Sequence, residues 1–380
     1  MKDYFQPEAL QTLIEEYASF GIHRTGWPAD DRCSDWLLGW LEQFGVEPGL
    51  SEFTFPYVET RAAYVEAEGA LVQGTPLHDG GATPPGGVRG PVVAGAGGDL
   101  AGRIAVVRGP QELAALLDAP AEGRPAAVIA VSGDPEGNVL LRNAEAIDHP
   151  HELPVIQVAL KDAGPIEQAL ASGAEVSVVL DFTRSRGTAT NVVGRLPANG
   201  TEAPIMITTP KSGWFTCAAE RGGGLAITLA LAAHLARSAS RRREVLFLFT
   251  SGHEINYYGM LEHLKANPDL RERVHTWVQL GASIGARNQP AWRVFSRDET
   301  LRKSMSEALE RQGLGPVTLA PVDQRPGGEA REVFDRRFLA LAGGHPYFHS
   351  PRDIPEVAVD AERVARFGLA FRELVDGLVG

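Results

Sequence analysis

Cysteine is nearly absent from this sequence of 380 residues, which contains only Cys33 and Cys217. Two cysteines so far apart supply neither a disulfide framework nor the closely spaced thiols of a structural metal site. The chain also lacks a run of about 18 apolar residues, so no membrane-spanning helix is expected. Its opening, MKDYFQPEALQTLIEEY, has acidic residues where a signal peptide has an apolar core. These absences predict a cytoplasmic protein without a membrane partner.

Positive charge is also scarce, because 36 Lys and Arg residues face 48 Asp and Glu residues and the formal net charge is −12. The one basic block, Arg241-Arg242-Arg243, is too short for the basic stripe that a phosphate backbone requires. Nucleic acid is therefore not an expected partner. Hydrophobic residues make up 44% and charged residues 22% of the chain, as in soluble globular proteins. The length allows two or three domains.

Helical periodicity opens the chain. Apolar residues spaced near 3.6 predict helices at about 8–19 and 32–44. The segment between them carries Pro28 near a helix start, and Asp30 or Asp31 is the expected N-cap. The chain therefore begins with two amphipathic helices.

The middle of the sequence differs from the first helices in its residue composition and hydrophobic pattern. From about 62 to 187, dense Gly and Pro alternate with short β-branched runs such as RIAVVRG, AAVIAVSG and LPVIQVAL. This change predicts a β-rich inserted domain at 62–187. Residues 1–61 and 188–380 would then close into one main domain on either side of it.

Buried strands alternate with helices after Asn191. Apolar runs such as APIMITT, EVLFLFT and HTWVQLG are separated by segments that read as helices, at about 222–237, 257–266, 299–312 and 360–378. Continuous apolar strands alternating with helices indicate a sheet that is covered on both faces. The expected fold class is α/β, with a mostly parallel mixed sheet flanked by helices.

Ligands of open α/β sheets bind at the carboxyl ends of the strands, so the residues after each apolar run are the candidates for a site. His253 and Glu254 follow VLFLFT, Glu220 precedes a predicted helix, and His349 lies in a Pro-flanked loop. Imidazole and carboxylate groups of this kind are zinc ligands. The four residues come from distant segments, so their spacing alone is a weak signal.

Several of these segments resemble the co-catalytic zinc aminopeptidases, a family that includes bacterial leucyl aminopeptidases, glutamate carboxypeptidase II and, on a related fold, glutaminyl cyclases. FGIHRTGWPADDRCSDWLLGWLEQFGVE resembles the first helices of that family, and GGHPYFHSPRDIPE is similar to its final His-Ser/Thr-Pro-x-Asp loop. Residues 92–182 resemble the protease-associated domain that is often inserted in it. The resemblance implies a zinc aminopeptidase-like fold with such an insert.

The resemblance carries over only part of the family's metal site. Pro210-Lys211-Ser212 stands where the family has His-x-Asp, and Gln279-Leu280-Gly281 stands where it has Asn-Leu-Asp. Glu220 matches the metal-bridging Asp, His253-Glu254 matches the paired general base and ligand, and His349 matches the last His. Plausible metal donors therefore remain at Glu220, Glu254 and His349.

These losses disfavour a pair of zinc ions, since each ion needs about four donors and a shared bridge. Two alternatives remain open. In the first, Glu220, Glu254 and His349 hold a single divalent ion, with zinc the first choice, and His253 joins them or replaces the general base. In the second, the site binds no metal and Lys211 places an ammonium group where a metal cation would be.

The resemblance implies a hydrolase that acts on an amide or related bond of a small molecule or short peptide. His253, Glu254 and Lys211 are the candidate catalytic residues. Candidate substrate-binding residues lie beside the same segments: Trp214, Tyr257, Arg287, Glu329 and Arg331. The rivals are a non-enzymatic binding or scaffold protein on the same fold and a metal-independent enzyme that uses Lys211 and His253. Self-association of the chain is left open.

Three other chemistries have weaker support. Cys217 lies near a predicted helix start, where a thiol pKa can fall, but a free cysteine is more often a small buried apolar residue. Ser212 and Ser251 lack the GxSxG elbow of a serine hydrolase. The run GGVRGPVVAGAGGDL lacks the ordered strand, GxGxxG and helix of a dinucleotide site.

Overall fold

The computed structural model describes residues 3–238, 241–288 and 291–380. The chain divides into two compact units. The main unit consists of Met1–Thr54, Thr188–Phe348 and Arg352–Gly380, and the inserted unit consists of Phe55–Gly187 and His349–Pro351. The division falls within two long strands, β1 (Glu47–Ala67) and β8 (Glu175–Leu196).

The main unit is built around a mixed sheet in the order β12-β13-β11-β9-β10-β8. Its central strands β13, β11, β9 and β10 run parallel, whereas the outer strands β8 and β12 pair antiparallel with their neighbours. Besides β8, the strands of this sheet are β9 (Glu202–Pro210), β10 (Arg243–Thr250), β11 (Thr276–Leu280), β12 (Ala291–Phe295) and β13 (Phe338–Gly344). The predicted α/β class, a mostly parallel mixed sheet with flanking helices, is confirmed.

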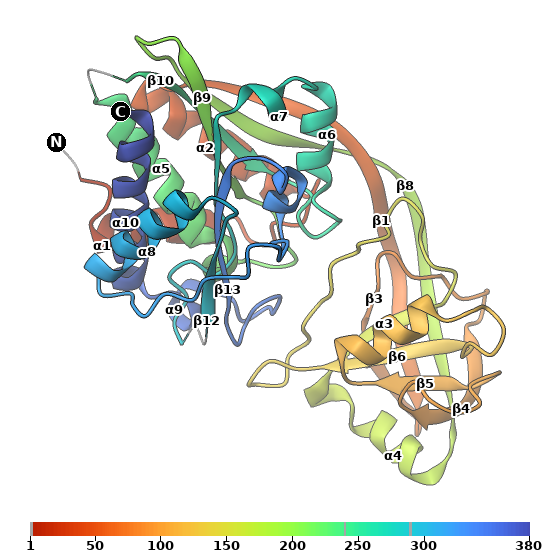
Figure 1. The fold of residues 1–380 in the computed structure, drawn as a ribbon. Coiled ribbons are helices and arrows are strands. Elements are labelled where there is room, and N and C mark those ends of the chain that lie inside the picture. The colour runs from red at the N-terminus through yellow and green to blue at the C-terminus, as the bar shows by residue number, and fades with distance from the viewer. Residues whose placement is uncertain (1–2, 239–240, 289–290) are drawn as a thin grey trace. The chain divides into compact units, whose positions relative to one another are not determined.

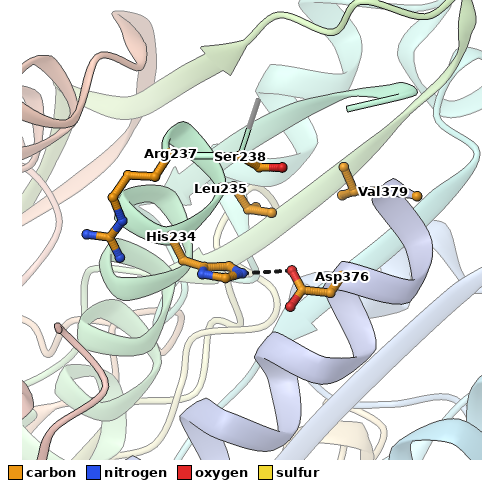
Figure 2. Close-up of a pocket in the computed structure, with 7 residues that line it drawn as sticks. His234, Leu235, Arg237, Ser238, Asp376 and Val379 are labelled. Carbon is orange, nitrogen blue, oxygen red and sulfur yellow. Dashed lines mark hydrogen bonds and ion pairs between the residues drawn. The ribbon is translucent and has the colours of Figure 1, made fainter. Parts of the chain in front are cut away.

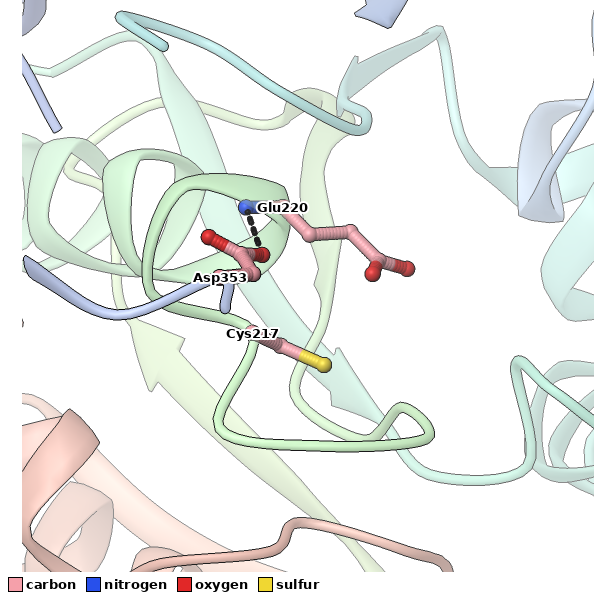
Figure 3. A group of neighbouring side chains, drawn as sticks. All are labelled: Cys217, Glu220 and Asp353. Atoms are coloured by element: carbon pink, nitrogen blue, oxygen red, sulfur yellow. Dashed lines mark hydrogen bonds between the residues drawn. The ribbon is translucent and has the colours of Figure 1, made fainter. Parts of the chain in front are cut away.

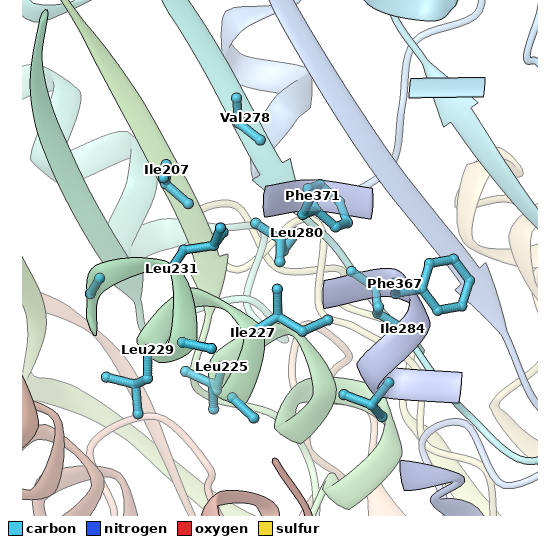
Figure 4. Close-up of a cluster of buried hydrophobic side chains, with 14 of the residues drawn as sticks. Ile207, Leu225, Ile227, Leu229, Leu231, Val278, Leu280, Ile284, Phe367 and Phe371 are labelled. Atoms are coloured by element: carbon cyan, nitrogen blue, oxygen red, sulfur yellow. The ribbon is translucent and has the colours of Figure 1, made fainter. Parts of the chain in front are cut away.

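Alternate residues of β9 pack on opposite faces of this sheet, as the period of two in a strand requires. Ile205 and Ile207 join a large apolar cluster with helices on one face, while Met206 joins a smaller cluster on the other. Figures 1 and 4 show helices on both faces and the packing of the larger cluster. The helices of the larger cluster are α1 (Pro7–Ser19), α2 (Pro28–Phe44), α5 (Gly223–Ala236), α8 (Glu299–Arg311) and α10 (Ala361–Val379).

The smaller cluster includes residues of α6 (Tyr258–Ala266), α7 (Leu270–Arg273) and the 3-10 turn η3 (Glu329–Val333). A short helix, α9 (Pro355–Ala358), precedes α10. No helix among the described residues is long and apolar enough to cross a membrane.

The start of α2 differs from the sequence prediction. The helix begins at Pro28 with Trp27 as its N-cap, so neither Asp30 nor Asp31 is the cap. Proline at the first helical position is favourable because its missing N–H has no partner there. Asp30 instead lies in the first turn, and its side chain is fully buried. Its carboxylate therefore pairs with a residue outside this helix.

The inserted unit contains parallel strands as well as helices. Its strands β4 (Val88–Ala94), β5 (Ile104–Val107), β6 (Ala127–Ser132) and β7 (Val155–Ala159) pair in parallel in that order. The short strands β2 (Ala70–Gln73) and β3 (Thr75–Pro76) and the long strand β8 add antiparallel pairs. Helices α3 (Pro110–Asp118) and α4 (Gly164–Ser172) and the turn η1 (Leu160–Asp162) complete it. Its likeness to a protease-associated domain stays a prediction.

Helix α5 starts against the backbone of the loop after β11, and this close approach is testable. A Cβ atom added to Gly223 would lie 2.0 Å from the Ile284 carbonyl oxygen. We therefore expect Gly223→Ala to lower the free energy of unfolding by about 1–3 kcal/mol, because a backbone atom must move. Urea-induced unfolding measures the change.

Gly39 provides the matched control, since it is also helical and a Cβ atom there meets nothing within 4 Å. Gly39→Ala should raise the free energy of unfolding by about 0.5–1 kcal/mol through its better helix propensity. Equal effects of the two substitutions would show that the close contact at Gly223 does not exist.

Candidate active site

The candidate site lies where three parallel strands of the main unit end. β9 and β10 are in register at their last residues, Pro210 and Thr250, so the segments that follow leave the sheet side by side. The turn after β10 needs glycine at position 252, which has a φ of +84° and whose Cβ would lie 2.7 Å from a backbone nitrogen. This turn places His253 and Glu254 at the edge of the sheet.

Lys211, the first residue after β9, forms a buried ion pair with Asp30 from the first turn of α2. Neither side chain is more than 1% exposed. The Lys211 ammonium also donates to the Asp30 carbonyl oxygen at 3.2 Å, and the Ser251 hydroxyl contacts both carboxylate oxygens of Asp30 at 2.8 Å. Burial raises the pKa of Asp30, while Lys211 and Ser251 oppose that rise.

Glu254 is held by neutral donors instead of a cation. Its Oε1 accepts the backbone N–H of Thr25 at 2.6 Å, and its Oε2 accepts the Ser212 hydroxyl at 2.8 Å. Ser212 Oγ accepts the backbone N–H of Gly252 at 2.9 Å in turn. The carboxylate is 1% exposed, so the network fixes it inside the protein.

Glu220 forms an ion pair with its neighbour Arg221 at 2.5 Å, and neither side chain has any exposed area. Both residues lie in a π-helical turn, η2 (Ala218–Gly222), which directly precedes α5. Arg221 also donates from Nε to the carbonyl oxygen of Ser212 at 2.9 Å. The guanidinium group thus links the start of α5 to the end of β9.

His253 pairs with Glu329, a residue of η3 that is fully buried. Its Nδ1 lies 2.9 Å from Glu329 Oε1, which also accepts the Thr250 hydroxyl at 3.1 Å. Gln279 of β11 donates to Glu329 Oε2 at 3.2 Å. Burial alone would raise the pKa of Glu329, but the charge and hydrogen bond of His253, helped by Arg221, hold that pKa below its usual value.

The second nitrogen of His253, Nε2, has no hydrogen-bond partner among the described residues, and 8% of the side chain is exposed. Its ring meets that of Tyr257 edge to face, with 5.0 Å between the centroids. The Arg331 guanidinium lies 4.6 Å from the Tyr257 ring centroid and donates to Asn256 at 2.8 Å. His253 therefore sits at the border of the buried network, beside an aromatic ring and a cation.

The loop after His253 is strained. Asn256 and Tyr257 both have positive φ, 61° and 58°. A non-glycine residue in this region costs of order 1–3 kcal/mol, and such residues cluster at functional sites. The strain supports a functional reading of the His253–Tyr257 segment.

A metal ion bound by Glu220 and Glu254 does not fit this arrangement. Both oxygens of Glu254 already accept hydrogen bonds, and a divalent cation beside Glu220 would face the buried charge of Arg221. Lys211 brings a third obstacle, because its ammonium group is fixed at the same edge of the sheet. The arrangement favours the metal-free alternative of the two that the sequence leaves open.

One other group of potential ligands meets among the described residues, namely Cys217, Glu220 and Asp353, whose ligand atoms lie within 4.8 Å of one another (Figure 3). Asp353 accepts the backbone N–H groups of Ala219 and Glu220 at 2.7 and 3.0 Å, so it caps the π-helical turn. Burial, and then the two carboxylates, raise the pKa of Cys217 well above its usual value. A protonated thiol with 1% exposure is a poor nucleophile.

The remaining candidates lie in different surroundings. His349 belongs to the inserted unit, where its Nδ1 is 2.6 Å from the Leu141 carbonyl oxygen, so its role as a metal ligand stays a prediction. Trp214 is 3% exposed and lies near the Arg24 guanidinium, 6.0 Å from the ring centroid. Arg287 donates to the Val359 carbonyl oxygen and lines a separate pocket with residues of α1 and α9.

A surface pocket of about 460 Å³ lies at the opposite end of α5 from Glu220 (Figure 2). It is lined by His234 and Asp376, which are 2.8 Å apart, and by residues at the ends of α5 and α10. The strand ends that carry His253 and Glu254 are not part of it. This pocket is therefore separate from the candidate active site.

Sequence reasoning missed several residues of the network, including Asp30, Arg221 and Thr25. Asp30 was expected to act as a helix cap, and its actual partner is 181 positions away. A signal did exist for Lys211, because a lysine directly after a buried strand needs a buried anion.

Solved structures resemble this chain along its whole length. BSAP, a zinc aminopeptidase from Bacillus subtilis, superposes with a TM-score of 0.79 at 16% identity, covering 100% of this chain and 96% of that one. A peptidase M28 precursor from Shewanella amazonensis gives 0.74 at 17% identity, with 97% and 96% covered. A glutaminyl cyclase from Porphyromonas gingivalis gives 0.54 at 11% identity, with 100% of both chains covered.

At these identities the likeness establishes the fold. The chain has a zinc aminopeptidase-like fold, and the resemblance seen in its sequence is confirmed at that level. No family model matches the sequence, and no curated protein matches it either.

His23 next to this network offers a test by pH. It is fully buried, stacks on Tyr17 with 3.8 Å between the ring centroids, and its backbone pairs with the segment after Ser212. Burial, and then the charge of Lys211, lower its pKa from 6.5 to about 3. Between these values the unfolded chain binds the proton more tightly, so stability is lost as the pH falls below about 6.5.

We expect His23→Phe, which keeps the stack on Tyr17, to flatten this dependence. Lowering the pH from 6.5 to 5 should cost the wild type about 2 kcal/mol more than the variant, at roughly 1.4 kcal/mol per unit. Urea unfolding at both pH values gives the two differences. The same substitution at His149, which is exposed, serves as the control. If the free energy of unfolding changed equally with pH in His23→Phe and in the wild type, His23 would not be the source of the pH dependence.

Proposed function

We propose that this chain is an enzyme that hydrolyses or otherwise transforms an amide or related bond of a small molecule or short peptide, and that His253 moves the proton. One observation carries the proposal: His253 has a buried carboxylate on Nδ1 and, among the described residues, no hydrogen-bond partner on Nε2. This is the arrangement of a general base, since the carboxylate fixes the orientation of the ring and the tautomer that it adopts. Neighbours named as aminopeptidases and a glutaminyl cyclase support amide chemistry on this fold.

The other residues take positioning roles in this proposal. Gln279 and Thr250 hold the Glu329 carboxylate, which fixes the imidazole. His253 Nε2 accepts a proton from water or from an amine of the substrate and returns it to the leaving group. Tyr257 and Arg331 lie beside the ring and would contact the substrate. Lys211 and Glu254 are too deeply buried for such contacts and act by holding the strand ends.

A non-enzymatic binding protein is the second candidate, and one observation favours it. Lys211 and Glu254 are committed to internal partners, so two of the three expected catalytic groups are unavailable to a substrate. This candidate predicts that ligands bind at the strand ends without turnover. Kinetic measurements with variants of His253 separate the two.

We expect His253→Ala to lower kcat by roughly 10² to 10⁴, because general acid–base catalysis contributes about that much. The assay uses a panel of amino-acid amides and short peptides, including peptides with an amino-terminal glutamine. Glu329→Gln should also lower kcat, but by less than His253→Ala does. The amide keeps a hydrogen-bonding group beside Nδ1, although it removes the negative charge. A chelator should leave the wild-type rate unchanged.

His149→Ala is the matched control, because this histidine is exposed and lies in the inserted unit. Folding of each variant is checked by circular dichroism and thermal unfolding. His253→Glu adds a second test, since it places another carboxylate beside Glu254 and Glu329 and should remain inactive in a metal-free site. Wild-type kcat in His253→Ala would remove this residue from the mechanism.

A further inference from the structure

We infer that Lys211 and Arg221 are built-in cations that take the place of metal ions at this edge of the sheet, so that the centre is closed to divalent metals. The inference goes beyond the proposed function, because it concerns what neutralises the buried carboxylates and holds whether or not the chain is an enzyme. It rests on a disagreement between the fold, whose solved neighbours include zinc aminopeptidases, and the side chains found at the strand ends.

Every carboxylate of the centre has a partner from the chain itself. Three of them pair with a basic side chain: Asp30 with Lys211, Glu220 with Arg221, and Glu329 with His253. The fourth, Glu254, accepts the Thr25 N–H and the Ser212 hydroxyl. A metal ion would therefore have to compete with a contact from the chain at each of these carboxylates.

Lys211 replaces a cation in position as well as in charge. Its side chain has no exposed area, and its ammonium group contacts the carboxylate and the carbonyl oxygen of Asp30. An ammonium group is a compact point charge with three donors and no acceptor, so it attracts oxygen ligands as a small metal cation does. The Ser251 hydroxyl donates to the same Asp30 carboxylate at 2.8 Å.

Arg221 performs the same task for Glu220. Its guanidinium group is fully buried, is ion-paired at 2.5 Å and is anchored through Nε on the Ser212 carbonyl oxygen. Because a guanidinium group stays charged at any physiological pH, this positive charge is permanent. A divalent ion entering beside Glu220 would have to displace it into a region without solvent.

Isolated charges of this kind cannot stay buried, so removing one cation should destabilise the protein strongly. Lys211→Met leaves Asp30 without a counter-charge, and we expect it to lower the melting temperature by roughly 10 °C. Asp30→Leu should do the same by stranding the ammonium group. The double variant should be much more stable than the sum of the two losses, since an apolar pair can replace a buried ion pair.

The exposed ion pair Arg89–Glu175, with 73% and 54% of the side chains exposed, is the matched control. A double-mutant cycle on that pair should show almost no coupling. Chemical rescue adds a second readout. Ethylammonium should raise the melting temperature of Lys211→Ala towards the wild-type value and leave the control variants unchanged.

The wild-type protein gives a test that needs no variant. After dialysis against a chelator, zinc added in equimolar amounts should remain unbound and leave the melting temperature unchanged. Stoichiometric zinc binding that Glu254→Gln abolishes would overturn the inference, and so would additive losses in the Lys211 and Asp30 cycle. These readouts do not use activity, so their failure is distinct from a failure of the proposed function, which depends on kcat of His253 variants.

Discussion

The buried ion pair between Lys211 and Asp30 is the interaction on which the rest of the site depends. It joins the end of β9 to the first turn of α2, and Ser251 from the turn after β10 closes it. Three segments far apart in the chain are thereby fixed at one edge of the sheet. A charge without solvent needs a partner of opposite sign, so none of the three can move alone.

A similar logic extends to the neighbouring groups. The Ser212 hydroxyl reaches Glu254, the Ser212 carbonyl holds Arg221, and Arg221 pairs with Glu220. His253 differs in one respect, because one ring nitrogen binds a buried carboxylate while the other has no hydrogen-bond partner among the described residues. A ring nitrogen of this kind can take up a proton, which is why the proposed function places proton transfer at His253. This contrast links the electrostatics of the site to its proposed function.

The fold could be predicted from the sequence because its signals are local. Continuous apolar strands such as EVLFLFT, alternating with helical periodicity, indicate a covered parallel sheet, and β10 and α10 follow these patterns closely. The rule that sites lie at strand ends selected the segments with Lys211, His253 and Glu254, and these segments do leave the sheet beside one another. Their role as a site stays a prediction. Pairing is a different matter, since it depends on which distant side chains meet.

Asp30 illustrates that limit. Its position near a helix start favoured a capping role, yet helix α2 starts two residues earlier and directs Asp30 into the interior. Glu329 is another case, because a 3-10 turn that no periodicity announces brings it to His253. The partners of these two residues therefore depend on tertiary packing. The family resemblance gave the positions of the candidate site residues, but not the contacts that their side chains make.

The central proposal for this site is that its charges are neutralised by the chain and not by metal. Anomalous diffraction at the zinc absorption edge, from crystals grown with zinc, tests it most directly. We predict no anomalous peak near Glu220 or Glu254, and Lys211 Nζ in contact with Asp30. A peak at about 2 Å from a carboxylate oxygen of Glu220 or Glu254, with Lys211 or Arg221 displaced, would contradict the account.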